Sequence, residues 1–139
     1  MSEPIQASGT KSRLWMGCVA ALVLYWIVLA LVTHWPRGAP TVSVANFDKV
    51  EHLAGYFVLG SLLGACTALR YGATRRNLLI AWGVVLVYAA LEEITQIPFN
   101  RQCELYDWFA DAIGSGLALS LIGVGVWLNG RRSLEGRLG

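Results

Sequence analysis

The hydrophobic and polar residues of this chain are arranged in long blocks. Four blocks are apolar, and they lie at Leu14–Thr33, Val50–Leu69, Leu78–Ile97 and Trp108–Leu128. Each is about 20 residues long, the length that an α-helix needs to cross a hydrocarbon core of about 30 Å. The pattern predicts an all-α fold, a transmembrane bundle of four helices over residues 14–128. A polar tail at 1–13 and a basic tail at 129–139 flank this membrane domain.

Composition leads to the same class of protein. The chain has 139 residues, of which 55% are hydrophobic and 14% are charged. The four spans use more than half of this length, so we expect no separate soluble domain within it. The net charge of +2 is too small to indicate a nucleic-acid partner. The three cysteines, Cys18, Cys66 and Cys103, match no zinc motif and are expected to be inert.

The basic residues predict how the helices are oriented. Eight lie in the N-terminal tail, the second connection and the C-terminal tail: Lys11, Arg13, Arg70, Arg75, Arg76, Arg131, Arg132 and Arg137. Three lie on the opposite side: Arg37, Lys49 and Arg101. Cytoplasmic segments of membrane proteins carry the excess of Lys and Arg. We therefore expect both termini in the cytoplasm of a multi-pass protein of the bacterial cytoplasmic (inner) membrane, in contact with membrane lipids.

The acidic residues gather at the other set of helix ends. Seven of the nine lie there: Asp48, Glu51, Glu92, Glu93, Glu104, Asp107 and Asp111. Charges near hydrocarbon are costly, so such a cluster indicates a functional site. With both termini cytoplasmic, this site would face outward, toward the cell envelope.

The second span begins with a polar edge. Asp48, His52 and Tyr56 are spaced by four residues and therefore share one helix face, with Lys49 beside them. One interpretation is that these three residues belong to a functional site. The alternative is that Asp48 only caps the helix and His52 is incidental, since acidic residues favour helix N-termini.

The third span ends in a similar group. Tyr88, Glu92 and Gln96 are spaced by four, and Glu93 borders the same face. Two adjacent carboxylates after fourteen uncharged residues are costly, so at least one should be neutral, paired or hydrated. The alternative is that both simply lie in water at the level of the lipid headgroups.

The fourth span and the loop before it complete the set. Asp107 and Asp111 share a helix face above Ser115, and Gly114 allows another helix to approach closely. Arg101 lies in the loop, where its guanidinium can bind a carboxylate or phosphate through two hydrogen bonds. The alternative is a salt bridge from Arg101 to one of the nearby acids.

In an up-and-down bundle these groups reach one level, and the set is compatible with three roles. These are binding of a divalent cation, acid–base catalysis on a lipid headgroup, and an ion-pair network that locks the helices together. The catalytic candidates are Asp48, His52, Glu93 and Asp107. The ligand-binding candidates are Lys49, Tyr56, Gln96, Arg101 and Asp111. The metal candidates are Asp48, His52, Glu93, Asp107 and Asp111.

The ordered polar motifs resemble those of the VanZ-like family of small bacterial membrane proteins. They are Asp48-Lys49-x-x-His52, Glu93-x-x-Gln96, Arg101 followed six residues later by Asp107, and Asp111-x-x-Gly114. The resemblance covers roughly residues 20–128 and implies that the family's characteristic polar positions are these: Asp48, Lys49, His52, Glu93, Gln96, Arg101 and Asp107. Many members have asparagine where this chain has Asp111, and the added negative charge favours a cation or a protonated acid there.

The resemblance implies an envelope protein and supplies no substrate. The family is named for a protein that gives low-level resistance to the glycopeptide teicoplanin. One hypothesis is therefore a non-enzymatic protein whose outward pocket binds a lipid-linked cell-wall component or the polar end of a glycopeptide. The alternative is an intramembrane enzyme, dependent on a metal or on acid–base groups, that acts on a lipid headgroup. Transport is less favoured, because the chain has no broken helices or internal repeats.

Overall fold

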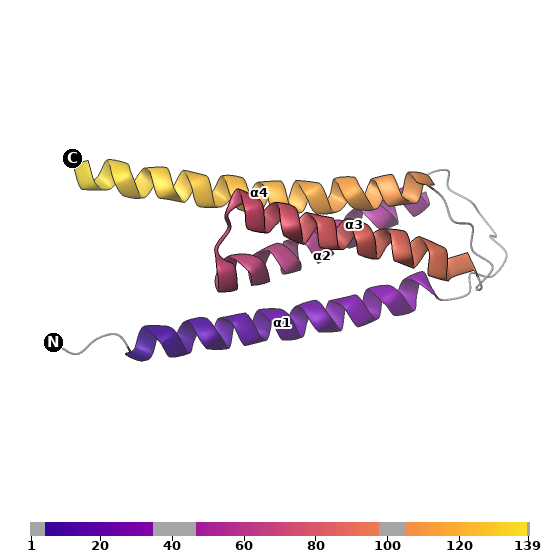
Figure 1. The fold of residues 1–139 in the computed structure, drawn as a ribbon, viewed down its shortest axis with the longest axis horizontal. Coiled ribbons are helices and arrows are strands. Elements are labelled where there is room, and N and C mark those ends of the chain that lie inside the picture. The colour runs from indigo at the N-terminus through magenta and orange to yellow at the C-terminus, as the bar shows by residue number, and fades with distance from the viewer. Residues whose placement is uncertain (1–4, 35–46, 98–104, 139) are drawn as a thin grey trace.

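The protein folds as four antiparallel helices in an up-and-down bundle (Figure 1). The computed structural model describes residues 5–34, 47–97 and 105–138. The helices are α1 (Ile5–Thr33), α2 (Phe47–Tyr71), α3 (Arg75–Gln96) and α4 (Leu105–Leu138). All four are long and apolar enough to cross a membrane, which confirms the predicted all-α transmembrane bundle. The start of α1 and the end of α4 lie at the same end of the bundle (Figure 1).

The helices extend beyond the apolar stretches. Helix α1 begins at Ile5, nine residues before Leu14, and α4 continues through the basic tail to Leu138. Backbone hydrogen bonds within a helix do not depend on an apolar side-chain pattern, so a span can continue as helix into the headgroup region. The tails expected to flank the membrane domain are thus largely continuations of its first and last helices.

Helices α2 and α4 pack most closely, and glycines allow their close approach. A Cβ atom added at Gly114 would lie 2.2 Å from the carbonyl oxygen of Leu53. One added at Gly60 would lie 2.9 Å from Cα of Ser115. Both distances are too short for real atoms, so only glycine fits at these positions. This confirms the prediction that Gly114 lets another helix approach, and it identifies α2 as that helix.

Hydrogen bonds to backbone carbonyls connect α1 to α2 and α3 to α4. The Tyr25 hydroxyl of α1 donates to the carbonyl of Gly55 in α2 at 2.8 Å. Two indole N–H groups link α3 and α4 at 3.1 Å: Trp82 donates to Ala112, and Trp108 donates to Leu86. Amphipathic aromatic residues thereby satisfy their polar atoms without water, as burial in a bilayer requires.

The core is small and the lipid-facing surface is large. Tyr56, Leu59, Val85 and Ala89 form one buried cluster, between α2 and α3, and Ala110, Ala118 and Leu119 of α4 are also buried. Large apolar side chains elsewhere are well exposed on all four helices, as at Val32 and Val87, each 63% exposed. A soluble protein rarely exposes so much apolar surface, whereas a membrane helix presents it to acyl chains.

Two of the cysteines lie at the α1–α2 interface. The Sγ atoms of Cys18 and Cys66 are 2.7 Å apart, and Cys18 also lies 3.6 Å from the carbonyl of Leu62. Both are packed between helices, where a thiol behaves as a small apolar group. Cys103 lies outside the described residues.

Candidate functional site

Polar side chains from all four helices meet inside the bundle at one end. We call this end, where α1 and α3 end and α2 and α4 begin, the acidic end. The buried groups there are Thr33, His52, Tyr56, Glu92, Glu93, Asp107 and Asp111, and we call them the polar cluster. Each exposes less than a tenth of its surface. Burial of four carboxylates is costly unless each is paired, protonated or bound to a cation.

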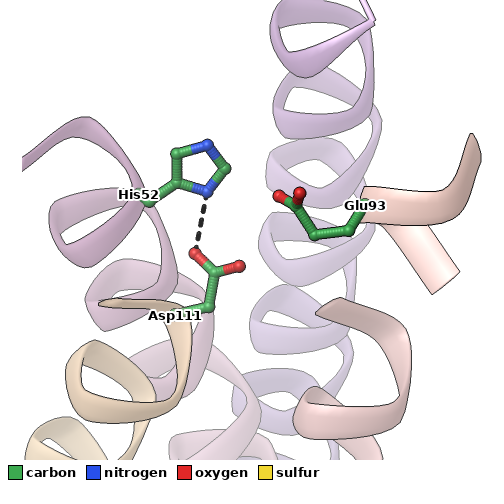
Figure 2. Close-up of side chains that lie close together, drawn as sticks. All are labelled: His52, Glu93 and Asp111. Atoms are coloured by element: carbon green, nitrogen blue, oxygen red, sulfur yellow. Dashed lines mark hydrogen bonds and ion pairs between the residues drawn. The ribbon is translucent and has the colours of Figure 1, made fainter. Parts of the chain in front are cut away.

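His52 is held between two carboxylates from α4. Its Nδ1 shares a hydrogen bond with Oδ1 of Asp111 at 3.0 Å (Figure 2), and its Nε2 lies 3.9 Å from Oδ2 of Asp107. Asp107 and Asp111 are one helical turn apart, so the imidazole lies along the face that they share. This arrangement fixes the orientation of the ring. It also connects α4 to the face of α2 that carries His52.

The cluster reaches the surface through Lys49. Its ammonium lies 3.4 Å from Oδ1 of Asp107, and its side chain is one-third exposed. Lys49 precedes His52 by three residues on α2, so both reach the same part of α4. Asp107 thus lies between a histidine and a lysine, both cationic when protonated.

Glu92 belongs to a second network, centred on α3. The Tyr56 hydroxyl donates to its Oε2, and the Thr33 hydroxyl donates to its Oε1. Glu92 is 3% exposed and Glu93 is 4% exposed. The alternative that both carboxylates are simply exposed to water is therefore wrong. Glu92 and Thr33 were not among the predicted site residues, although the four-residue spacing of Tyr88 and Glu92 was a signal for the former.

His34 lies at the edge of the same region. Its Nδ1 bonds to the carbonyl of Ala30 at 2.9 Å, and its Nε2 bonds to the Thr95 hydroxyl at 3.0 Å. This contact ties the end of α1 to the end of α3. The only signal in the sequence is a pair of polar residues, Thr33 and His34, at the end of the first apolar stretch.

Several predicted site residues cannot be placed in the cluster. Asp48 lies in α2 and Gln96 in α3, but their side chains are outside the described part of the chain. Arg101 is outside it altogether. The structure does bring together Lys49, His52, Tyr56, Glu93, Asp107 and Asp111. The roles assigned to all nine positions stay predictions.

A pocket of about 230 Å³ opens between α1 and α2 beside the cluster. Its walls are largely apolar, formed by Tyr25, Val28, Leu29, Val32 and Gly55. Its remaining lining is polar: Thr33, Glu51, His52 and Tyr56. Val32 is exposed on the lipid-facing surface, whereas His52 is buried, so the pocket leads from the membrane toward the cluster.

A larger groove of about 730 Å³ lies between α3 and α4 near the other end of the bundle. Leu78, Trp82, Leu119 and Trp127 are among its mainly apolar lining residues, which include no acidic group. Apart from Arg75 and Ser120, this lining offers little beyond contact with acyl chains.

Chemically, the cluster combines metal ligands with acid–base groups. Atoms of His52, Glu93 and Asp111 lie within 4.8 Å of one another, and imidazole and carboxylate are common ligands of divalent ions. The oriented histidine is also a side chain of the type that most often serves as a general acid or base. Comparisons with protein-family models, curated proteins and solved structures find no match for this chain.

Proposed function

We propose that this four-span membrane protein binds the polar head of a lipid-linked cell-wall component at its acidic end. The observation that carries the proposal is the pocket between α1 and α2, which has apolar walls toward the membrane and ends at Thr33 and His52. A lipid could place its chain along Val28 and Val32 and its head beside His52. Ligand pockets typically combine such apolar walls with a few convergent polar groups.

The charges of the cluster suit a head rich in hydrogen-bond donors. Ionised Glu and Asp side chains only accept hydrogen bonds, so Glu51 and Asp107 favour hydroxyl, amide and amine groups. Sugars and peptides supply these groups. Lys49, one-third exposed at the edge of the cluster, supplies a cation for a phosphate of such a head. The proposed ligand is thus a glycolipid or peptidyl lipid with a phosphate linkage.

The resemblance to the VanZ-like family supports the same reading. On this proposal the protein lies in the bacterial cytoplasmic membrane with both termini in the cytoplasm, so the acidic end faces the envelope. Binding of a cell-wall precursor, or of the polar end of a glycopeptide, would limit the access of teicoplanin to its target. Expression of the protein would then lower teicoplanin susceptibility without producing a changed lipid.

Filling the pocket is expected to weaken lipid binding. The probe is lipid II, an undecaprenyl-pyrophosphate-linked sugar–peptide, added to detergent-purified protein and followed by native mass spectrometry. Val32→Trp places an indole at the pocket wall and should lower lipid II occupancy about tenfold, because an added side chain displaces the acyl chain. Val87→Trp is the matched control, since Val87 is equally exposed but lies on α3, outside this pocket.

Equal loss of occupancy in both variants would contradict the pocket as the binding site. If lipid II and phosphatidylglycerol bind equally well, and Val32→Trp changes neither, the pocket would only make the unspecific lipid contacts of any membrane protein. Direct binding of teicoplanin, lowered by Val32→Trp but without binding of lipid II, would make the glycopeptide the ligand.

The geometry of His52 favours a second candidate, an intramembrane acid–base enzyme acting on the same headgroup. A histidine oriented by a carboxylate is the usual arrangement of a general base. Here Asp111 bonds one ring nitrogen, while the other lies 3.9 Å from Asp107. In this reading His52 moves a proton during headgroup transfer or hydrolysis, and Asp111 keeps the ring in place.

The enzyme hypothesis predicts that replacing His52 lowers turnover much more than binding. With lipid II as probe, His52→Gln should lower product formation about 10²–10⁴-fold, the range for loss of a general base. Occupancy should stay within tenfold of the wild type, because glutamine keeps a donor toward Asp111. Mass spectrometry of the extracted lipids detects the product. Absence of any new lipid species with folded wild-type protein would contradict the enzyme reading and leave the binding proposal intact.

A further inference from the structure

Three ligand-type side chains converge from three different helices. His52 comes from α2, Glu93 from α3 and Asp111 from α4, and Figure 2 shows their polar atoms facing one another. One ligand atom from each lies within 4.8 Å of the other two. Their exposed fractions are 6%, 4% and 1%, so they meet inside the bundle.

One carboxylate oxygen of Asp111 has no hydrogen-bond partner within the described part of the chain. Oδ1 of Asp111 is bonded to His52, but Oδ2 has no partner among the described residues, although the residue is almost completely buried. In Figure 2 this second oxygen is directed toward the side on which Glu93 lies. A buried carboxylate oxygen without a partner is costly, and a cation is the group that satisfies it most directly.

We propose that His52, Glu93 and Asp111 form a binding site for one divalent transition-metal ion, such as Zn²⁺ or Mn²⁺. Bonds of about 2.0–2.6 Å allow two ligands of one ion to lie about 3–5 Å apart. The 3.0 Å between Nδ1 of His52 and Oδ1 of Asp111 and the 4.8 Å limit for the group fall within this range. The imidazole favours Zn²⁺ over Mg²⁺ and Ca²⁺, which prefer oxygen ligands alone, and the two carboxylates are ligands that also suit Mn²⁺.

The neighbouring charges are consistent with a cation at this position. The cluster contains four buried carboxylates, and Lys49 lies 3.4 Å from one of them, Asp107. Asp107 lies 3.9 Å from Nε2 of His52, on the side of the ring away from Asp111. A metal-bound histidine typically has a carboxylate on the side of its second nitrogen, and Asp107 lies on that side at ion-pair distance.

The site goes beyond the proposed lipid binding and does not depend on it. An ion held by α2, α3 and α4 would join three helices that otherwise meet here through side chains with costly buried charges. It would also provide a positive centre at the polar end of the pocket. Metal binding and lipid II binding can therefore be tested separately, and failure of one leaves the other in place.

Metal binding is tested on full-length protein purified without a histidine tag and stripped with a chelator. Zn²⁺ and Mn²⁺ are added separately, and bound metal is measured by elemental mass spectrometry and calorimetry. We expect one ion per chain. Asp111→Asn and Glu93→Gln each remove a charged ligand and should weaken binding at least tenfold. Glu135→Gln removes an exposed acid of α4 and should leave binding unchanged.

A spectroscopic measurement starts from the wild-type protein and uses two variants only to assign its signal. Electron spin-echo spectra of the Mn²⁺-loaded protein should show the nitrogen of one imidazole. The chain has two histidines, so His34→Gln should keep this signal and His52→Gln should lose it. Folded wild-type protein that binds neither metal stoichiometrically, or a signal that follows His34, would overturn the proposal. So would unchanged metal binding in folded Asp111→Asn and Glu93→Gln.

Discussion

Replacing Gly114 with alanine is expected to destabilise the bundle by about 3 kcal/mol or more, the upper end for overpacking. The added Cβ would lie 2.2 Å from the carbonyl oxygen of Leu53 and 3.1 Å from the amide nitrogen of Phe57. Both contacts are backbone atoms of α2, so no side chain can rotate away. The helices would have to separate along their closest contact. Unfolding of the purified protein by heat or by denaturing detergent measures the loss.

The same substitution elsewhere in α4 provides the control. A Cβ added at Gly125 meets no heavy atom within 4 Å, so Gly125→Ala should leave stability unchanged or raise it by up to about 1 kcal/mol through helix propensity. Equal effects at the two positions would contradict the α2–α4 packing. A large loss at Gly125 instead would indicate that this face of α4 contacts a second chain.

The arrangement of the helices was predictable because membrane thickness limits the possibilities. Leu14–Thr33 and the three later stretches each match the width of a bilayer, and sequential spans with short connections pack antiparallel. The gathering of the acidic residues at one end was predictable for the same reason, because successive helices run in opposite directions. Close packing at Gly114 was predictable because small residues are how membrane helices approach one another. Its partner, α2, was not, since any of the other helices could use that surface.

The pairing within the cluster could not be derived from spacing. Glu92 and Glu93 are adjacent, about 100° apart around α3, and either could face the centre of a bundle. The structure shows that both do: Glu92 bonds to the Tyr56 and Thr33 hydroxyls, while Glu93 lies near His52. Predicting the partners of Glu92 requires the position of α1, and the periodicity within α3 carries no information about that position.

The contribution of α1 is the part that sequence patterns missed most clearly. Its Thr33 and His34 bond to Glu92 and Thr95 of α3, and its apolar residues form one wall of the pocket. Polar atoms at the end of a span carry no periodic signal. Their partners lie about 60 residues away in sequence, so only the fold identifies them.

Removing His52 is expected to have the second large effect on stability. In chelator-treated protein, His52→Leu should cost about 3–5 kcal/mol, because it leaves a buried carboxylate without its hydrogen-bond partner. Asp111 exposes only 1% of its surface, and within the described part of the chain His52 is the side-chain hydrogen-bond partner of its carboxylate, so water cannot replace the imidazole there without a rearrangement. Unfolding in denaturing detergent, followed by circular dichroism, measures this loss.

A double-mutant cycle separates the pairing from loss of the imidazole's packing. Asp111→Asn alone should cost about 1–2 kcal/mol, since the amide oxygen still accepts a hydrogen bond from His52. Combined with His52→Leu, it removes the buried charge, so the double variant should be more stable than His52→Leu by about 2 kcal/mol. Additive losses would contradict a coupled pair and assign the effect of His52→Leu to packing alone. Recovery in the double variant would show that part of the stability of the acidic end rests on charge compensation, the property that a bound cation would supply more strongly.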